Sequence, residues 1–142
     1  MIGIASDHAG FKLKQFVKEY LEEKELKYKD YGAFSDDSSN YGEFGHKLAL
    51  GIESGEVEMG IGICGSGEGM TMTLNKHRGI RAGLSWIPDI AKLIRQHNDA
   101  NVLVMPGRFI DNDTAREIMD QFLNTPFQGG RHKERVDSIP IK

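Results

Sequence analysis

The sequence contains a single cysteine, Cys64, among its 142 residues. One thiol cannot form an intrachain disulfide, and a zinc site needs more ligands than this residue supplies. The sequence also lacks an apolar run long enough to span a bilayer, and it opens on a strand-like segment without the pattern of a signal peptide. We therefore expect a cytoplasmic protein with no membrane partner.

A strong charge of either sign is missing as well. Lys and Arg number 18 and Asp and Glu 21, so the formal net charge is −3, which gives no electrostatic reason to expect nucleic acid. No two histidines have the i, i+4 spacing of a metal-binding helix, and we expect neither a metal nor an organic cofactor. The length and the 39% hydrophobic content suit one domain over residues 1–142, with a C-terminal tail from about residue 124.

What the sequence does contain is a regular alternation of strand and helix patterns. Apolar strand-like runs are expected at 1–6, 27–31, 59–63, 80–84 and 101–105. Helical patterns are expected at 11–21, 44–55, 71–76, 88–97 and 114–123, the last opening on a capping box at Thr114. The tail after residue 123 is expected to be irregular. Five alternations with apolar strands predict an α/β fold, a three-layer α/β/α sandwich with a five-stranded parallel, Rossmann-like sheet.

The most informative segment is 59–70, where an apolar strand ends at Cys64 and a loop with alternating glycines leads into a helix. Glycines let the backbone approach a ligand closely, and a helix N-terminus offers unpaired N–H groups, so this loop suits an oxyanion and is expected to lower the pKa of the thiol. Phosphate-binding and dinucleotide motifs do not fit its spacing. A cysteine phosphatase would need arginine where Met70 stands. A lone cysteine is otherwise most often a small buried hydrophobe.

In a parallel α/β sheet the site lies at the carboxyl ends of the strands, where Asp7, His8, Cys64, Ser85 and Arg108 are expected. Several further residues have two interpretations each. His97 ends a helix, where it either performs chemistry or complements the helix dipole. Arg131 and Arg135, four residues apart, either clamp a phosphate or belong to a solvated tail. Tyr41 either binds a sugar or packs, and His8 is otherwise a surface histidine in a turn.

Several motifs together resemble one family. They are Ser-Asp-His-Ala-Gly (6–10), Cys-Gly-Ser-Gly (64–67), Asn-Lys (75–76), Gly-Ile-Arg-Ala (79–82), Arg-Gln-His-Asn-Asp (95–99) and Gly-Gly-Arg-His (129–132). In order and spacing, over nearly the whole chain, they resemble the type B ribose-5-phosphate isomerases. That family also includes galactose-6-phosphate and allose-6-phosphate isomerases.

The resemblance implies an aldose–ketose isomerase of the pentose phosphate pathway, without metal or cofactor, that interconverts ribose 5-phosphate and ribulose 5-phosphate through an enediolate. It implies that Cys64 moves the proton between C1 and C2 and that His97 opens the sugar ring. The substrate-binding positions it implies, together with neighbouring candidates, are Asp7, His8, Tyr41, Gly65, Ser66, Gly67, Glu68, Gly69, Asn98, Arg108, Arg131, His132 and Arg135. It further implies a homodimer or homotetramer with shared active sites.

Three departures from the family pattern bear on the choice of sugar: Asn40-Tyr41-Gly42, Ser66 and Glu68. The alternatives are a six-carbon allose- or galactose-6-phosphate isomerase and a non-catalytic sugar-phosphate binder. The helix from Pro88 starts at the edge that carries Cys64 and is expected to run back across the sheet for roughly 15 Å. His97 should therefore lie too far from the Cys64 of its own chain and act in the site of a neighbouring subunit.

Overall fold

The computed structural model describes residues 1–142 and contains one five-stranded sheet in which all neighbouring strands are parallel. The strands are β1 (Ile2–Ser6), β2 (Tyr28–Asp30), β3 (Met59–Cys64), β4 (Ala82–Leu84) and β5 (Val102–Pro106). Their order across the sheet is β2-β1-β3-β5-β4. The register pairs Ser6 with Ile63 and Cys64 with Pro106, so the carboxyl ends of the three central strands lie side by side.

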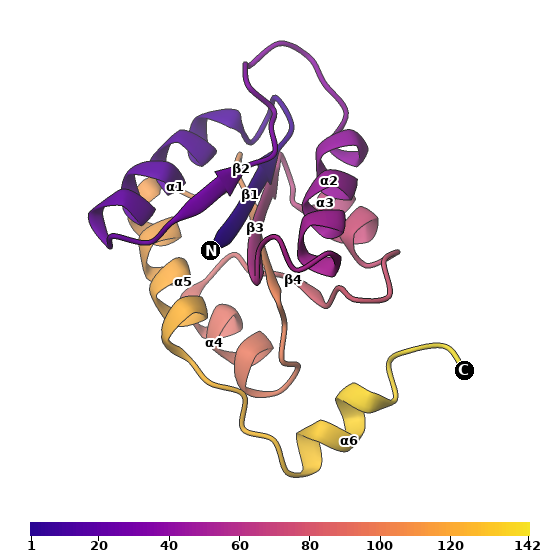
Figure 1. The fold of residues 1–142 in the computed structure, drawn as a ribbon. Helices are drawn as coiled ribbons and strands as arrows, with labels where there is room; N and C mark the ends of the chain where they lie inside the picture. Colours follow the sequence, from indigo (N-terminus) through magenta and orange to yellow (C-terminus); the bar gives the residue numbers. More distant parts are fainter.

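Helices cover both faces of this sheet (Figure 1). The helices are α1 (Phe11–Glu23), α2 (Tyr41–Glu53), α3 (Glu68–Leu74), α4 (Pro88–Gln96), α5 (Asn112–Asn124) and α6 (Arg131–Asp137). One buried cluster joins α1, α4 and α5 to side chains such as Ile4, Ile63 and Leu103, and a second joins α2 and α3 to Val102, Val104 and Cys64. The alternation along each strand thus fills two cores, which confirms the predicted three-layer sandwich.

The strands and most of the helices lie where the sequence pattern predicted them, and three details of the prediction were wrong. Helix α3 begins at Glu68, not Thr71. Helix α5 is capped by Asp111, whose carboxylate accepts a hydrogen bond of 2.8 Å from the Thr114 N–H, so Thr114 lies inside the helix and does not cap it. The tail is not irregular throughout, because it forms α6. None of the helices has both the length and the hydropathy that crossing a membrane requires.

Candidate functional site

Cys64 ends β3 at the carboxyl edge of the sheet, and only 4% of it is exposed. Its carbonyl accepts a hydrogen bond of 2.9 Å from the Gly107 N–H, and the Gly65 carbonyl accepts one of 3.0 Å from the Arg108 N–H. These bonds tie the loop after β3 to the loop after β5. The end of the strand that carries the thiol is therefore fixed against the loop that carries Arg108.

The loop from Gly65 to Gly69 requires glycine at two positions. Gly67 has φ 82°, and a Cβ there would come within 2.3 Å of the Leu84 side chain. A Cβ on Gly69 would come within 2.3 Å of the Tyr41 ring. Tyr41 therefore packs directly on the loop while its residue stays 42% exposed. The glycines allow the backbone N–H groups to close around the position of the thiol.

Burial raises the pKa of the Cys64 thiol above its ordinary value, while hydrogen bonding from the N–H groups of Met70, Gly67 and Gly69 acts in the opposite direction. The nearby Asp7 carboxylate also raises the pKa. The expectation that the helix start lowers this pKa was therefore wrong in its net direction, because loss of hydration outweighs the favourable donors. The same N–H groups are directed at the thiol, so this edge of the sheet offers hydrogen-bond donors of the kind that bind anions.

Two polar residues follow β1 beside this loop. The Asp7 carboxylate is buried and accepts a hydrogen bond of 3.0 Å from the Gly10 N–H. The His8 N–H donates to the Ser39 hydroxyl at 3.0 Å, and the Ser39 N–H lies 3.1 Å from His8 Nδ1. Nδ1 also lies 3.1 Å from the Ser39 carbonyl oxygen, so both contacts of the ring with Ser39 use Nδ1. Nε2 makes no hydrogen bond within the chain and remains available to a ligand. Ser39 was not predicted as a site residue, because its contact with His8 spans 31 positions in the sequence.

Arg108 completes this edge. A Cβ on Gly65 would lie 3.3 Å from Arg108 Cδ, so the arginine side chain crosses the start of the glycine loop. Ser66 and Glu68 are exposed at the tip of the loop, and the Ser66 hydroxyl accepts a hydrogen bond of 3.2 Å from the Glu68 N–H. We call the residues gathered here the carboxyl-edge group; they are Asp7, His8, Tyr41, Cys64, Gly65, Ser66, Gly67, Glu68, Gly69 and Arg108.

The remaining predicted residues form a second group at the other end of the sheet. His97 caps the C-terminus of α4 just before β5 begins, and its ring stacks on that of His132 with centroids 4.2 Å apart and planes 11° from parallel. Burial lowers the pKa of the His132 imidazole, and the charges of His97, Arg131 and Arg135 add to this effect. We call this the amino-edge group; it consists of His97, Asn98, Arg131, His132 and Arg135.

The two groups do not meet within one chain. Cys64 pairs with the last residue of β5, whereas His97 precedes the first, and a strand of five residues spans roughly 13 Å. Figure 1 shows α6, which carries Arg131 and Arg135, near the end of the molecule opposite the loop that joins β2 to α2. The structure therefore agrees with the predicted separation of His97 from Cys64 in a single chain.

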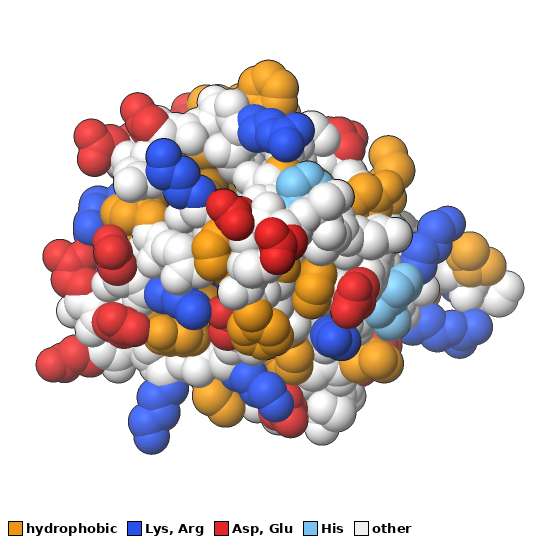
Figure 2. All heavy atoms as spheres, turned by 90° about the horizontal axis from the view of Figure 1, so that it is seen from above, with side chains coloured by type: hydrophobic (Ala, Val, Ile, Leu, Met, Phe, Trp, Pro, Cys, Tyr) orange, Lys and Arg blue, Asp and Glu red, His pale blue; other side chains and the backbone are white.

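No field of a single sign covers the carboxyl edge. Figure 2 looks down on the molecule from this side and shows basic, acidic and hydrophobic side chains interspersed. Together with the net charge of −3, this makes general attraction of an anion weak.

Comparison with known proteins bears on this arrangement of a buried thiol, a glycine loop and flanking polar groups. The family model described as Ribose/Galactose Isomerase matches residues 2–139. The chain belongs to this family. The Escherichia coli (strain K12) relative, Ribose-5-phosphate isomerase B, is 39% identical over 138 residues, which cover 97% of this chain and 93% of the relative.

Solved structures of the family have the same fold. A ribose 5-phosphate isomerase from Thermotoga maritima is 48% identical, covers 97% of this chain and 95% of its own, and superposes with a TM-score of 0.95. Ribose-5-phosphate isomerase B from Mycoplasma genitalium, solved with bound ribulose-5-phosphate, is 38% identical, covers 97% and 92% of the two chains, and gives a TM-score of 0.92. The sequence match over nearly the whole chain shows the family, and the superpositions show the fold.

Proposed function

We propose that this chain is an aldose–ketose isomerase that interconverts ribose 5-phosphate and ribulose 5-phosphate through an enediolate. The observation that carries the proposal is the placement of the Cys64 thiol against the N–H groups of Gly67, Gly69 and Met70. The full-length similarity to ribose-5-phosphate isomerases and the ribulose-5-phosphate bound in the Mycoplasma genitalium relative support the choice of substrate. A catalytic thiol also needs a reducing compartment, which favours the cytoplasm.

The proposed chemistry moves two protons, one from C2 to C1 and one from the C2 hydroxyl to O1. The Cys64 thiolate removes the proton from C2 of the open-chain aldose, the C–H electron pair forms the C1–C2 double bond, and the carbonyl pair becomes the enediolate oxygen O1. The proton of the C2 hydroxyl passes to O1 within the enediolate, the C2 oxygen becomes the ketone, and the thiol returns its proton to C1. Fixed N–H donors of the glycine loop stabilise the oxyanion, which is usually the largest catalytic contribution. Oxidation of one carbon balances reduction of its neighbour, so the step needs no external redox partner.

The sugar must be open before this step, and we propose that His97 of the partner subunit opens it. The separation of the two groups within one chain supports a two-fold dimer in which the amino-edge group of one subunit meets the carboxyl-edge group of the other. In this proposal Arg131 and Arg135 of the partner subunit hold the phosphate, and Asn98 of the partner subunit lies next to the ring-opening residue. A tetramer would contain two such dimers.

The proposed phosphate clamp predicts a selective loss on mutation. Arg131→Ala should weaken binding of ribose 5-phosphate by about 2 kcal/mol, the scale of a charged hydrogen bond. Inhibition by an unphosphorylated sugar analogue should hardly change. The matched control is Lys133→Ala on the same helix, which breaks only an exposed ion pair of 2.8 Å with Asp137. Equal losses for the charged and neutral ligands, measured by inhibition constants, would contradict a clamp.

A panel of sugar phosphates tests both the reaction and the sugar. Purified protein should isomerise ribose 5-phosphate, with lower kcat/KM for allose 6-phosphate and galactose 6-phosphate. If none of the three is isomerised while ribose 5-phosphate still binds, the chain is a sugar-phosphate binder and the isomerase proposal fails. A higher kcat/KM for a six-carbon sugar phosphate would support the isomerase reaction and show that ribose 5-phosphate is not the preferred substrate.

Glu68 is expected to influence that preference without being required for turnover. It is exposed at the tip of the glycine loop, and its side chain makes no hydrogen bond within the chain. Glu68→Val should keep activity on at least one sugar and change the ratio of kcat/KM between five- and six-carbon substrates. An unchanged ratio would show that the carboxylate only faces solvent.

A further inference from the structure

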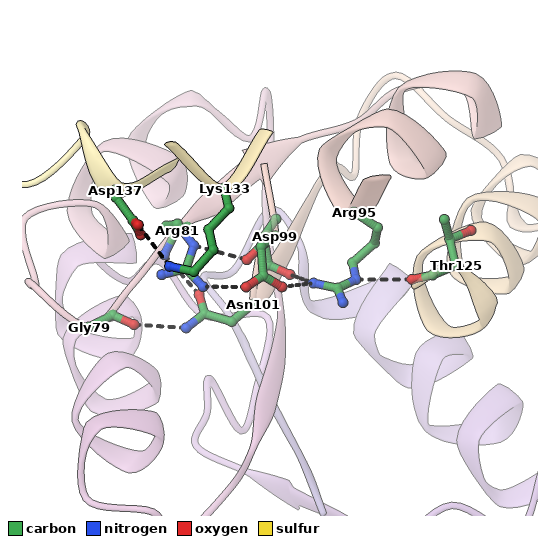
Figure 3. Close-up of polar contacts among 9 residues, drawn as sticks. Gly79, Arg81, Arg95, Asp99, Asn101, Thr125, Lys133 and Asp137 are labelled. Atoms are coloured by element: carbon green, nitrogen blue, oxygen red, sulfur yellow. Dashed lines mark hydrogen bonds and ion pairs between the residues drawn. The ribbon is translucent and has the colours of Figure 1, made fainter. Parts of the chain in front are cut away.

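Asp99 is the centre of a polar network directly after His97 and Asn98 (Figure 3). Its Oδ1 accepts a hydrogen bond of 3.0 Å from Arg95 Nη1, and its Oδ2 lies 3.3 Å from Arg81 Nη2. Its carbonyl accepts a second bond from Arg81, from Nε at 2.9 Å. Two arginines from different elements therefore hold the side chain and the backbone of one residue.

Arg95 links this turn to the segment that leads to α6. Its side chain is only 14% exposed, lies over the Phe122 ring, and donates to the carbonyls of Ala100 at 2.6 Å and Thr125 at 3.2 Å. Thr125 starts the connection from α5 to α6, and the Gln128 N–H also donates to the Gln96 carbonyl at 3.1 Å. The network thus fixes the end of α4 against the chain that carries Arg131 and His132.

Arg81 is held in its turn by Asn101. The Asn101 side chain accepts a hydrogen bond of 2.8 Å from the Arg81 N–H and donates one of 2.7 Å to the Gly79 carbonyl. Asn101 immediately precedes β5 and Arg81 immediately precedes β4. The two hydrogen bonds from Arg81 to Asp99 therefore connect Asp99 to the amino ends of these strands. The turn after α4 is consequently tied to the residues that lead into β4 and β5.

The backbone at Asp99 explains why such contacts are needed. Its φ is +48°, in the left-handed region that residues other than glycine rarely adopt, although Asp is among the more tolerant. This conformation turns the chain so that the Ala100 N–H reaches the Ile94 carbonyl at 2.9 Å. Side-chain contacts that hold an unfavourable backbone conformation at a site are typical of a position under functional constraint.

We propose that Asp99 is a positioning residue which, with Arg81 and Arg95, sets the orientation of His97 for ring opening. The inference rests on the proposed function, in which His97 acts on the sugar ring. Asp99 itself touches no substrate in this proposal. Its effect should therefore be confined to the step that His97 performs and should be absent from the proton transfer at Cys64.

A substrate that cannot form a ring separates the two steps. Ribose 5-phosphate closes its ring through the 4-hydroxyl, and its 5-hydroxyl is blocked by the phosphate. The analogue 4-deoxyribose 5-phosphate lacks the only hydroxyl that can close a five-membered ring, so it remains an open-chain aldehyde. Its isomerisation requires proton transfer alone.

We expect Asp99→Gly, which keeps the left-handed backbone accessible and removes both side-chain contacts, to lower kcat for ribose 5-phosphate at least about tenfold, since small misplacement of a reacting group has effects of this size. Turnover of 4-deoxyribose 5-phosphate should change less than about threefold. Asp99→Asn, which keeps an acceptor oxygen, should recover part of the lost turnover. Lys133→Ala, which breaks the exposed ion pair of α6 in Figure 3, should change neither substrate.

Parallel measurements on His97→Ala distinguish failure of this inference from failure of the proposed function. Selective loss on ribose 5-phosphate in His97→Ala but not in Asp99→Gly would overturn the positioning role and leave ring opening intact. Equal loss on both substrates in Asp99→Gly would show a merely structural role and would also overturn it. If His97→Ala itself loses both equally, the ring-opening assignment is wrong. If Asp99→Gly does not fold, Arg81→Gln takes its place, because it removes two of the three hydrogen bonds with Asp99. Its turnover of ribose 5-phosphate is then compared with its turnover of 4-deoxyribose 5-phosphate in the same way.

Discussion

Replacing Cys64 by alanine is expected to lower kcat for ribose 5-phosphate by roughly 10²-fold or more, the scale of a positioned general base. The binding of substrate should change little, because in the proposed site the phosphate and the hydroxyls are held by other groups. The thiol is only 4% exposed and comparable in size to a methyl group, so the fold should tolerate the change. Steady-state kinetics and binding of a non-isomerisable phosphorylated inhibitor measure the two quantities separately.

The pH profile provides the control for this assignment. Because burial raises the pKa of the Cys64 thiol, the reactive thiolate is the minor form near neutral pH, and kcat/KM of the wild type should rise with pH toward that pKa and level off above it. Cys64→Ser keeps the geometry, but its hydroxyl is a far weaker acid than the thiol. The residual kcat/KM of this variant should therefore not rise with pH over the range in which the protein stays folded. Near-wild-type turnover of Cys64→Ala would show that another group is the base.

The sheet and the glycine loop were predictable from local patterns in the sequence. A buried apolar strand ends at Cys64, and glycines follow at alternate positions. This pattern predicts a tight loop, because glycine can adopt positive φ, as Gly67 does in the structure. Helix α6 was missed because only His132 in it is buried, so its residues show no apolar periodicity. The start of α3 was placed too late because Gly67 and Gly69 resemble a loop more than the first turn of a helix.

Properties that depend on contacts between distant parts of the chain could not be predicted from local sequence patterns. The net rise in the pKa of Cys64 comes from burial, and most of the side chains in the buried cluster around this thiol lie far from it in the sequence, where no local motif reports them. The bond between Ser39 and His8 spans 31 positions, and those between Arg81 and Asp99 span 18. The residues that make these contacts have ordinary polar side chains and carry no motif of their own. Sequence patterns therefore indicate candidate site residues more readily than the residues that contact them.

Mixing two impaired variants is expected to restore activity. In a Cys64→Ala homodimer every site lacks the thiol, and in a His97→Ala homodimer every site lacks the ring-opening imidazole. If each site takes Cys64 from one subunit and His97 from the other, a hybrid dimer has one site with both substitutions and one site with neither. Random exchange of equal amounts makes half of the dimers hybrids, so the mixture should reach about a quarter of wild-type activity.

The structure offers matched pairs that must not complement, and these make the experiment specific. Cys64 and Arg108 both belong to the carboxyl-edge group and lie on adjoining loops of one chain. A hybrid of Cys64→Ala with Arg108→Ala therefore has one impairment in each site and should gain nothing, as should a hybrid of His97→Ala with Arg131→Ala. Cys64→Ala with Arg131→Ala should complement, because these residues belong to different groups. If native mass spectrometry confirms subunit exchange and the mixture of Cys64→Ala with His97→Ala gains no activity, the shared site is wrong and the placement of His97 in the partner's site must be revised.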